Sequence, residues 1–172
     1  MGYRGNLYDL VLVLHILSAI AGFGGVMFNG IYGRESAQMR GIGAFAITSA
    51  NEKASLLAEK FIFAVPVFGV LMVLLSDGVI TFGQAWLLLA IVIYAAAVTG
   101  ALAVLKPGGH RLVELTEQLA SMGPPPEGAA PGGPPPQVAE LEALGKRMAT
   151  VGGSLQLAMV IVLALMVFKP GI

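Results

Sequence analysis

The chain has 172 residues, of which 56% are hydrophobic and 12% are charged, with a formal net charge of zero and no cysteine. Soluble domains carry about 25% charged residues, so a chain with half that fraction and a mean hydropathy of +0.82 is expected in a lipid bilayer. A net charge of zero gives no overall electrostatic attraction to nucleic acid. The lack of cysteine excludes disulfides, thiolate zinc sites and iron–sulfur clusters.

Four stretches are apolar enough to cross a bilayer, which takes about 20 mostly apolar residues. They are residues 7–32, 61–75, 80–105 and 149–168. The second stretch is the shortest and contains Pro66, but the helical pattern that precedes it is expected to lengthen it. We therefore predict an all-α membrane protein, an antiparallel bundle of four transmembrane helices that forms one domain over residues 1–172.

Basic residues fall unequally on the two sides of these spans. The connections 33–60 and 106–148 hold Arg34, Arg40, Lys53, Lys60, Lys106, Arg111, Lys146 and Arg147, whereas the other side has only Arg4 and Lys169. Lys and Arg near the ends of a span stay on the cytoplasmic side. We predict a multi-pass membrane protein with both termini outside and both long connections in the cytoplasm.

The cytoplasmic connections are expected to extend the bundle with further helices. Ser49 and Glu52 have the spacing of a capping box, which predicts a helix that starts there and runs into the second span. The KPGG sequence at 106–109 predicts a break, followed by a short surface helix. Residues 123–136 contain seven prolines and predict an extended linker. A helical pattern from Gln137 leads into the last span.

Polar and small residues of the first span share one helix face. His15, Ser18, Gly22, Gly25 and Asn29 follow each other at steps of three and four residues, the spacing of one face of a helix. Small residues let helices approach closely, and polar side chains in hydrocarbon seek partners across that contact. The face is therefore either a helix-packing seam or the wall of a cofactor or ligand site.

Three interpretations of His15 follow from its place on this face. It either hydrogen-bonds a neighbour such as Tyr94, Thr99 or Gln156, or contacts a quinone, pigment or lipid headgroup, or ligates haem iron through a ring nitrogen. In the haem interpretation, Ser18, Gly22 and Gly25 make room for the macrocycle.

A second axial ligand for such a haem cannot be His110. That residue follows the inner end of the third span, about 20 Å or more from the level of His15. The candidates are Met159, Met72 or the His15 of a second copy of the chain.

The remaining intramembrane polar groups give little support to catalysis or transport. Ion-coupled transporters line their ion pathway with buried acidic or basic side chains. The middle parts of the four spans contain no Asp, Glu, Lys or Arg. No nucleophile sits beside a base, so no catalytic residue is predicted. Gly153 and Gln156 in the last span indicate a packing seam. We expect the first and last helices to pack through these residues and the Ser18, Gly22 and Gly25 face.

The sequence resembles a known family in three stretches. These are YDLVLVLHILSAIAGFGGVMF in the first span, VPVFGVLMVLL in the second, and AWLLLAIVIYAAAVTGALAVLKPGGHRL in the third. They resemble the bacterial integral membrane proteins grouped as domain of unknown function 2269. That family has no established activity to carry over.

A more distant similarity links the chain to membrane proteins of the protoporphyrinogen oxidase J and copper-resistance D types. Only His15 and the Gly24-Gly25 pair match, and the similarity implies that His15 binds haem b. The chain has Ala21-Gly22 where a tryptophan is usual, and it lacks a lysine inside the third span. The similarity therefore implies haem binding without the oxidase activity.

Two functional hypotheses result. In the first, the protein is a non-enzymatic accessory or structural subunit of a larger membrane complex, in contact with membrane lipid and with other membrane subunits or a second copy of itself. In the alternative, it is a haem b protein in electron transfer or porphyrin chemistry, with His15 as the axial ligand to iron.

Overall fold

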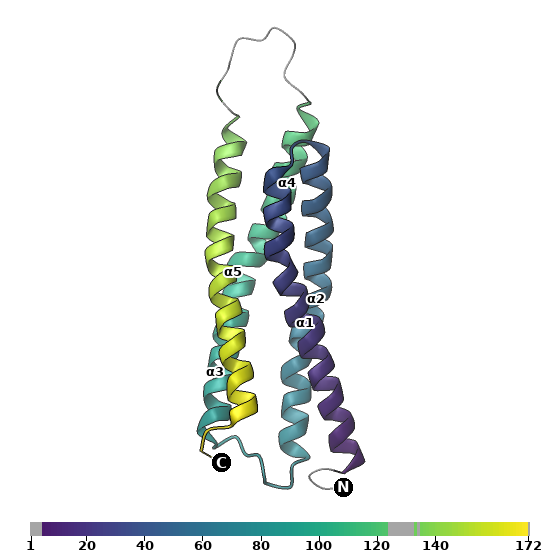
Figure 1. Ribbon diagram of the computed structural model, residues 1–172, viewed down its shortest axis with the longest axis vertical. Helices are drawn as coiled ribbons and strands as arrows, with labels where there is room; N and C mark the ends of the chain where they lie inside the picture. The colour runs from purple at the N-terminus through teal and green to yellow at the C-terminus, as the bar shows by residue number, and fades with distance from the viewer. Residues whose placement is uncertain (1–4, 124–132, 134, 172) are drawn as a thin grey trace.

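The structure, a computed structural model, describes residues 5–123, 133 and 135–171. These residues form the helices α1 (Asn6–Gln38), α2 (Ile42–Leu74), α3 (Ala85–Gly100), α4 (Lys106–Ser121) and α5 (Pro136–Phe168), shown in Figure 1. A π-helical turn, η1 (Ala101–Leu105), joins α3 to α4, so that the two form one helical rod. No strand occurs in this described part of the chain. The predicted all-α bundle of four long helices is confirmed.

The helices are long and apolar enough to cross a bilayer. α1, α2 and α5 have 33 residues each, and the rod from Ala85 to Ser121 has 37. At 1.5 Å per residue, 33 residues span about 50 Å, well beyond the hydrocarbon thickness of about 30 Å. Only 6 to 17% of each apolar window is buried within the bundle. The outward apolar surface requires lipid or other membrane helices around it, as in a multi-pass membrane protein.

The helices form two pairs that run antiparallel. α1 packs along α2, α3 packs along α5, and α4 packs on α2 to join the pairs. Figure 1 places the N- and C-terminal ends of the chain at one end of the bundle and the α1–α2 and α4–α5 connections at the other. We call the latter the basic end, because it carries most of the Lys and Arg residues. Most of the predicted linker at 123–136 lies outside the described residues.

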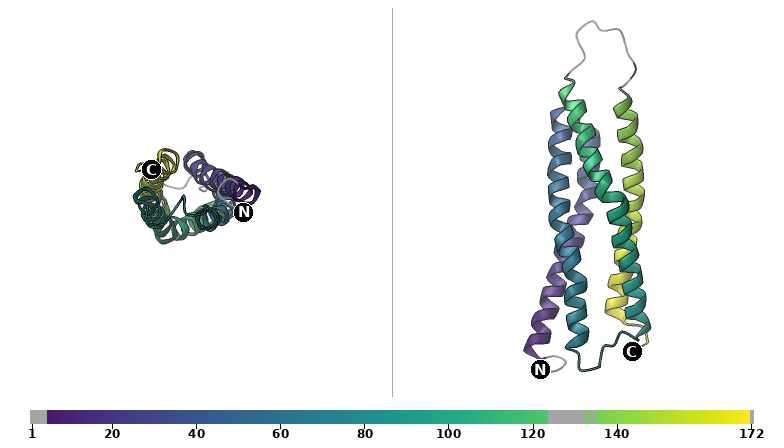
Figure 2. Two further views of the ribbon diagram at one scale, coloured as in Figure 1. Left: turned by 90° about the horizontal axis from the view of Figure 1, so that it is seen from below. Right: turned by 180° about the vertical axis from the view of Figure 1, so that it is seen from behind.

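The terminal end of the bundle is closed by a small core. Ile80, Trp86 and Leu87 are buried, and Val73, Leu165 and Met166 pack against them. The core therefore joins α2, the following turn, α3 and α5. Figure 2 shows from behind how the backbone of these segments runs at this end of the bundle. The Nζ atom of Lys169 lies 5.7 Å from the Trp86 ring centroid, a distance at which a cation is attracted to the ring.

One predicted helix start is wrong, and the apolar stretch 80–105 begins before the helix within it. α2 begins at Ile42, after Gly41 with φ of 59°, so Ser49 lies inside the helix and does not cap it. The helix does run on into the second span as predicted. α3 begins at Ala85 and not near Ile80, because the Ser76 hydroxyl donates to the Ile80 carbonyl at 2.9 Å and accepts the Ile80 N–H at 3.1 Å. These bonds hold the segment as a turn.

The predicted break at 106–109 is also wrong. The Lys106 N–H donates to the Ala101 carbonyl across η1, and the chain continues as a helix through Pro107. Gly108 packs so tightly that an added Cβ would lie 2.8 Å from the Met148 sulfur. Gly109 likewise packs against the carboxylate of Glu52 on α2. Tertiary packing thus overrides the low helix propensity of these glycines.

The small-residue face of α1 packs on α2. A Cβ added to Gly22 would lie 2.9 Å from Ile62 Cγ1, and one added to Gly25 would lie 2.5 Å from Ala58 Cβ. Farther along, the Ser55 hydroxyl donates to Asn29 Oδ1 at 3.1 Å. We call this row of contacts the α1–α2 seam.

The predicted packing role of Gly22, Gly25 and Asn29 is therefore supported, but the expected partner is wrong. The face meets the second helix and not the last, because its small residues match Ala58 and Ile62 of α2, and α1 makes few contacts with α5. Ser18, on the same face, is buried.

Gly25→Ala is expected to destabilise the bundle by about 1–3 kcal/mol, because the new methyl would overlap the rigid Ala58 Cβ and force the helices apart. Gly24→Ala is the matched control, since a Cβ there would meet no atom within 4 Å. The control is expected to be neutral or slightly stabilising, as alanine favours a helix over glycine. Unfolding of both variants in detergent measures the difference. Equal stabilities would contradict the seam.

Candidate functional site

His15 is the histidine within the first span, and it is tied to the backbone of α2. Its Nδ1 atom lies 2.9 Å from the carbonyl oxygen of Val65. A carbonyl only accepts, so Nδ1 carries the proton and the neutral ring keeps a lone pair on Nε2. Gly69, one turn along α2, makes room for the ring, because a Cβ there would lie 3.4 Å from His15 Cε1. His15 thus bonds none of Tyr94, Thr99 or Gln156.

The neighbouring carbonyl of α2 has its own partner on α3. Pro66 has no N–H, so the carbonyl of Ile62, one turn earlier, loses its normal helical donor. The hydroxyl of Tyr94 donates to that carbonyl. Pro66 is thus tolerated inside the helix because a side chain from another helix replaces the missing bond. Sequence reasoning missed this contact, although Pro66 predicts an orphan acceptor at Ile62.

The face predicted to hold a haem does not fit a macrocycle within the seam. Ile62 and Ala58 occupy the space next to Gly22 and Gly25, where the flat ring was expected. The glycines serve the close approach of α1 and α2. What remains of the haem hypothesis is the lone pair on His15 Nε2.

The predicted seam residues of the last span lie elsewhere. Gly153 is exposed on α5, and an added Cβ would meet no atom within 4 Å. Gln156 is half-buried on the same helix. The small-residue face of α1 packs on Ala58 and Ile62 of α2 instead.

A charged cluster joins α2 to α4 at the basic end. Glu52 Oε1 lies 3.1 Å from His110 Nδ1, and Glu59 Oε1 lies 2.8 Å from Lys106 Nζ. Gly109 packs directly on the Glu52 carboxylate, which leaves no room for a larger residue. The sequence did not predict this cluster, because its members come from two separate connections. The break expected at 106–109 also hid the fact that Lys106 and His110 lie on one helix.

Glu52 is the most enclosed carboxylate of the cluster, with 15% of its side chain exposed. Burial raises the pKa of Glu52, an effect that the nearby His110 and Lys106 partly offset. Across the described residues, no group of three or more His, Asp or Glu side chains could hold a metal ion. The cluster therefore holds helices together and offers no metal site.

Comparisons with protein-family models, with curated proteins and with solved structures find no match to this chain. The resemblances drawn from the sequence stay predictions, and the function has to be argued from the geometry alone.

Because the pKa of Glu52 is raised, we predict that the stability of the fold depends on pH. The folded protein binds this proton more tightly than the unfolded chain does, so the resulting stability is present at low pH and is lost as the pH rises through the raised pKa. The stability of Glu52→Gln relative to the wild type is therefore expected to increase as the pH rises above the ordinary carboxyl pKa of about 4.

Thermal unfolding in detergent at a series of pH values measures this difference. Glu117→Gln, at an exposed position of α4, corrects for the loss of one acidic charge. A relative stability of Glu52→Gln that falls over this range would contradict the effect of burial.

Proposed function

We propose that this protein is a non-enzymatic structural subunit of a membrane complex, and that α5 binds a transmembrane helix of a partner. The observation that carries the proposal is a contrast between two glycine faces. Gly22 and Gly25 in the α1–α2 seam pack against Ile62 and Ala58 of α2, whereas Gly152 and Gly153 of α5 have open space around them.

The open space belongs to a continuous face of α5. Thr150, Gly153, Leu157 and Val160 follow at steps of three and four residues and are all exposed, with Leu157 at 63% and Val160 at 61%. We call these four residues the open face. Its small residues, Thr150 and Gly153, are of the kind that lets transmembrane helices approach each other closely.

Chemistry within the membrane finds little support. His15 and Tyr94 each donate a hydrogen bond to a backbone carbonyl of α2. Thr99 donates to the Ala95 carbonyl of its own helix at 2.8 Å. Ser154, beside the open face, donates to the Thr150 carbonyl at 3.1 Å. These polar side chains stabilise helices and helix contacts, which is the role expected of a structural subunit.

The surroundings of the subunit follow from the same features. The exposed apolar side chains contact membrane lipid wherever no partner covers them. We place the subunit in a bacterial cytoplasmic membrane, as the family resemblance implies. The excess of Lys and Arg at the basic end supports an orientation with both termini outside and the connections 33–60 and 106–148 in the cytoplasm.

Crosslinking tests the open face directly, since the chain has no cysteine of its own. Gly153→Cys in native membranes is expected to crosslink to a specific partner chain with a short thiol-reactive or photoreactive reagent. Val92→Cys, at an exposed site of α3 (64%), is the control and is expected to give no discrete product. A product of twice the chain mass would identify a second copy as the partner. The same pattern of products from both positions would contradict the proposal.

Haem b binding is the second candidate function, and one observation favours it. The hydrogen bond from Nδ1 to Val65 fixes the tautomer whose Nε2 is free to ligate iron. A macrocycle on that nitrogen would have to lie outside the α1–α2 seam. A haem would supply one-electron chemistry when bound.

His15→Ala separates the two candidates. A structural subunit is expected to show a featureless visible spectrum, oxidised and reduced, and a loss of about 1 kcal/mol in unfolding free energy for the lost hydrogen bond. Thr99→Ala, which removes a bond within one helix, is the matched control for stability. A reduced α-band in the wild type that disappears in His15→Ala would instead establish the haem protein.

A further inference from the structure

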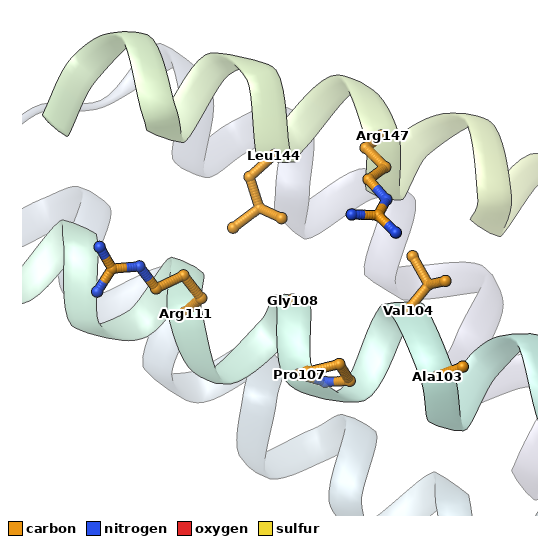
Figure 3. Close-up of a pocket in the computed structure, with 7 residues that line it drawn as sticks. All are labelled: Ala103, Val104, Pro107, Gly108, Arg111, Leu144 and Arg147. Carbon is orange, nitrogen blue, oxygen red and sulfur yellow. The ribbon is translucent and has the colours of Figure 1, made fainter. Parts of the chain in front are cut away.

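A cavity of about 190 Å³ lies at the basic end, between the α3–η1–α4 rod and α5. Its apolar wall includes Ala103, Val104 and Pro107 from the rod and Leu144 from α5. Figure 3 shows the side chain of Arg147 directed from α5 into the space between the helices, toward Val104. A single water needs only about 15 Å³, so the cavity has room for a larger polar group.

Arg147 differs from the other cations around this cavity in having no partner. Lys106 pairs with Glu59, and Arg111, which also lines the cavity, is held by Glu114 at 2.9 Å and Glu140 at 2.8 Å. Arg147 makes no ion pair or hydrogen bond with any residue that the structure describes. Its guanidinium therefore brings an uncompensated charge and five N–H donors to the cavity.

The cavity lies where the apolar part of the bundle ends. The apolar sequence of the rod stops at Leu105, and that of α5 starts at Ala149, next to the cavity residues. The phosphate groups of a bilayer lie at this boundary, directly outside the hydrocarbon. The π-helical turn η1 forms part of the cavity wall, and such turns are frequent at functional sites.

We propose that this cavity binds the phosphate of an anionic phospholipid headgroup, with Arg147 as the residue that contacts it. The apolar wall of Val104, Pro107 and Leu144 receives the glycerol and the first part of an acyl chain. Arg111 acts as a positioning residue, since its bonds to Glu140 tie α4 to α5 and keep the cavity open. A basic pocket between transmembrane helices matches the chemistry of such headgroups.

Native mass spectrometry of the full chain, released from nanodiscs of phosphatidylcholine with increasing phosphatidylglycerol at constant ionic strength, measures the binding. Arg147→Gln is expected to weaken retention of phosphatidylglycerol about fivefold, the effect of one charge near the membrane surface. Lys146→Gln, which removes the adjacent charge outside the cavity, is expected to change nothing. Ala103→Leu keeps every charge but fills the cavity and is also expected to weaken retention.

Each outcome bears on the proposal. Equal losses in Arg147→Gln and Lys146→Gln would overturn it in favour of general surface charge. Competition by inorganic phosphate that removes the bound phosphatidylglycerol completely would identify free phosphate as the ligand and overturn the lipid assignment. If Arg147→Gln does not fold, Ala103→Leu decides, because unchanged retention in that variant would exclude the cavity. The test uses the isolated chain, so it is independent of any partner on α5.

Discussion

The bundle depends on how the backbone of α2 is satisfied near Pro66. Hydrocarbon offers no hydrogen-bond donors, and an unsatisfied backbone group there costs several kcal/mol. Pro66 leaves the Ile62 carbonyl without its helical donor, and Tyr94 of α3 supplies one. His15 of α1 bonds the nearby Val65 carbonyl. α2 is thereby linked to α1 on one side and to α3 on the other, and a proline that would weaken an isolated helix specifies where its neighbours lie.

Features with a local physical cause could be predicted from the sequence. Hydropathy located all four membrane helices, because the composition of a span reflects its solvent. Periodicity placed His15, Ser18, Gly22, Gly25 and Asn29 on one face, and that face is a packing surface. The same reasoning could not identify the helix on the other side, since periodicity shows which face packs but carries no information about its partner.

The remaining differences have tertiary causes. Pro107, Gly108 and Gly109 are poor helix formers, yet the segment is helical, with Gly108 packed on Met148 and Gly109 on Glu52. The acceptor of His15 is a backbone carbonyl, which every residue has, so no side chain marks it. Pro66 does mark the Ile62 carbonyl as an acceptor without its helical donor, but no local pattern identifies Tyr94 as the donor. The cavity beside Arg147 likewise requires the rod and α5 to be side by side, which no local pattern shows.

The position of the α1–α2 seam along the chain determines an order of assembly during synthesis. Every residue of the seam belongs to the first two helices, so this hairpin has all of its contacts as soon as α2 enters the membrane. The donor for Ile62 belongs to α3 and emerges later. The Ile62 carbonyl therefore gains its donor only when α3 is in place, and α5 packs on α3 later still. The order of the helices along the chain lets the hairpin form first and the Pro66 site be completed afterwards.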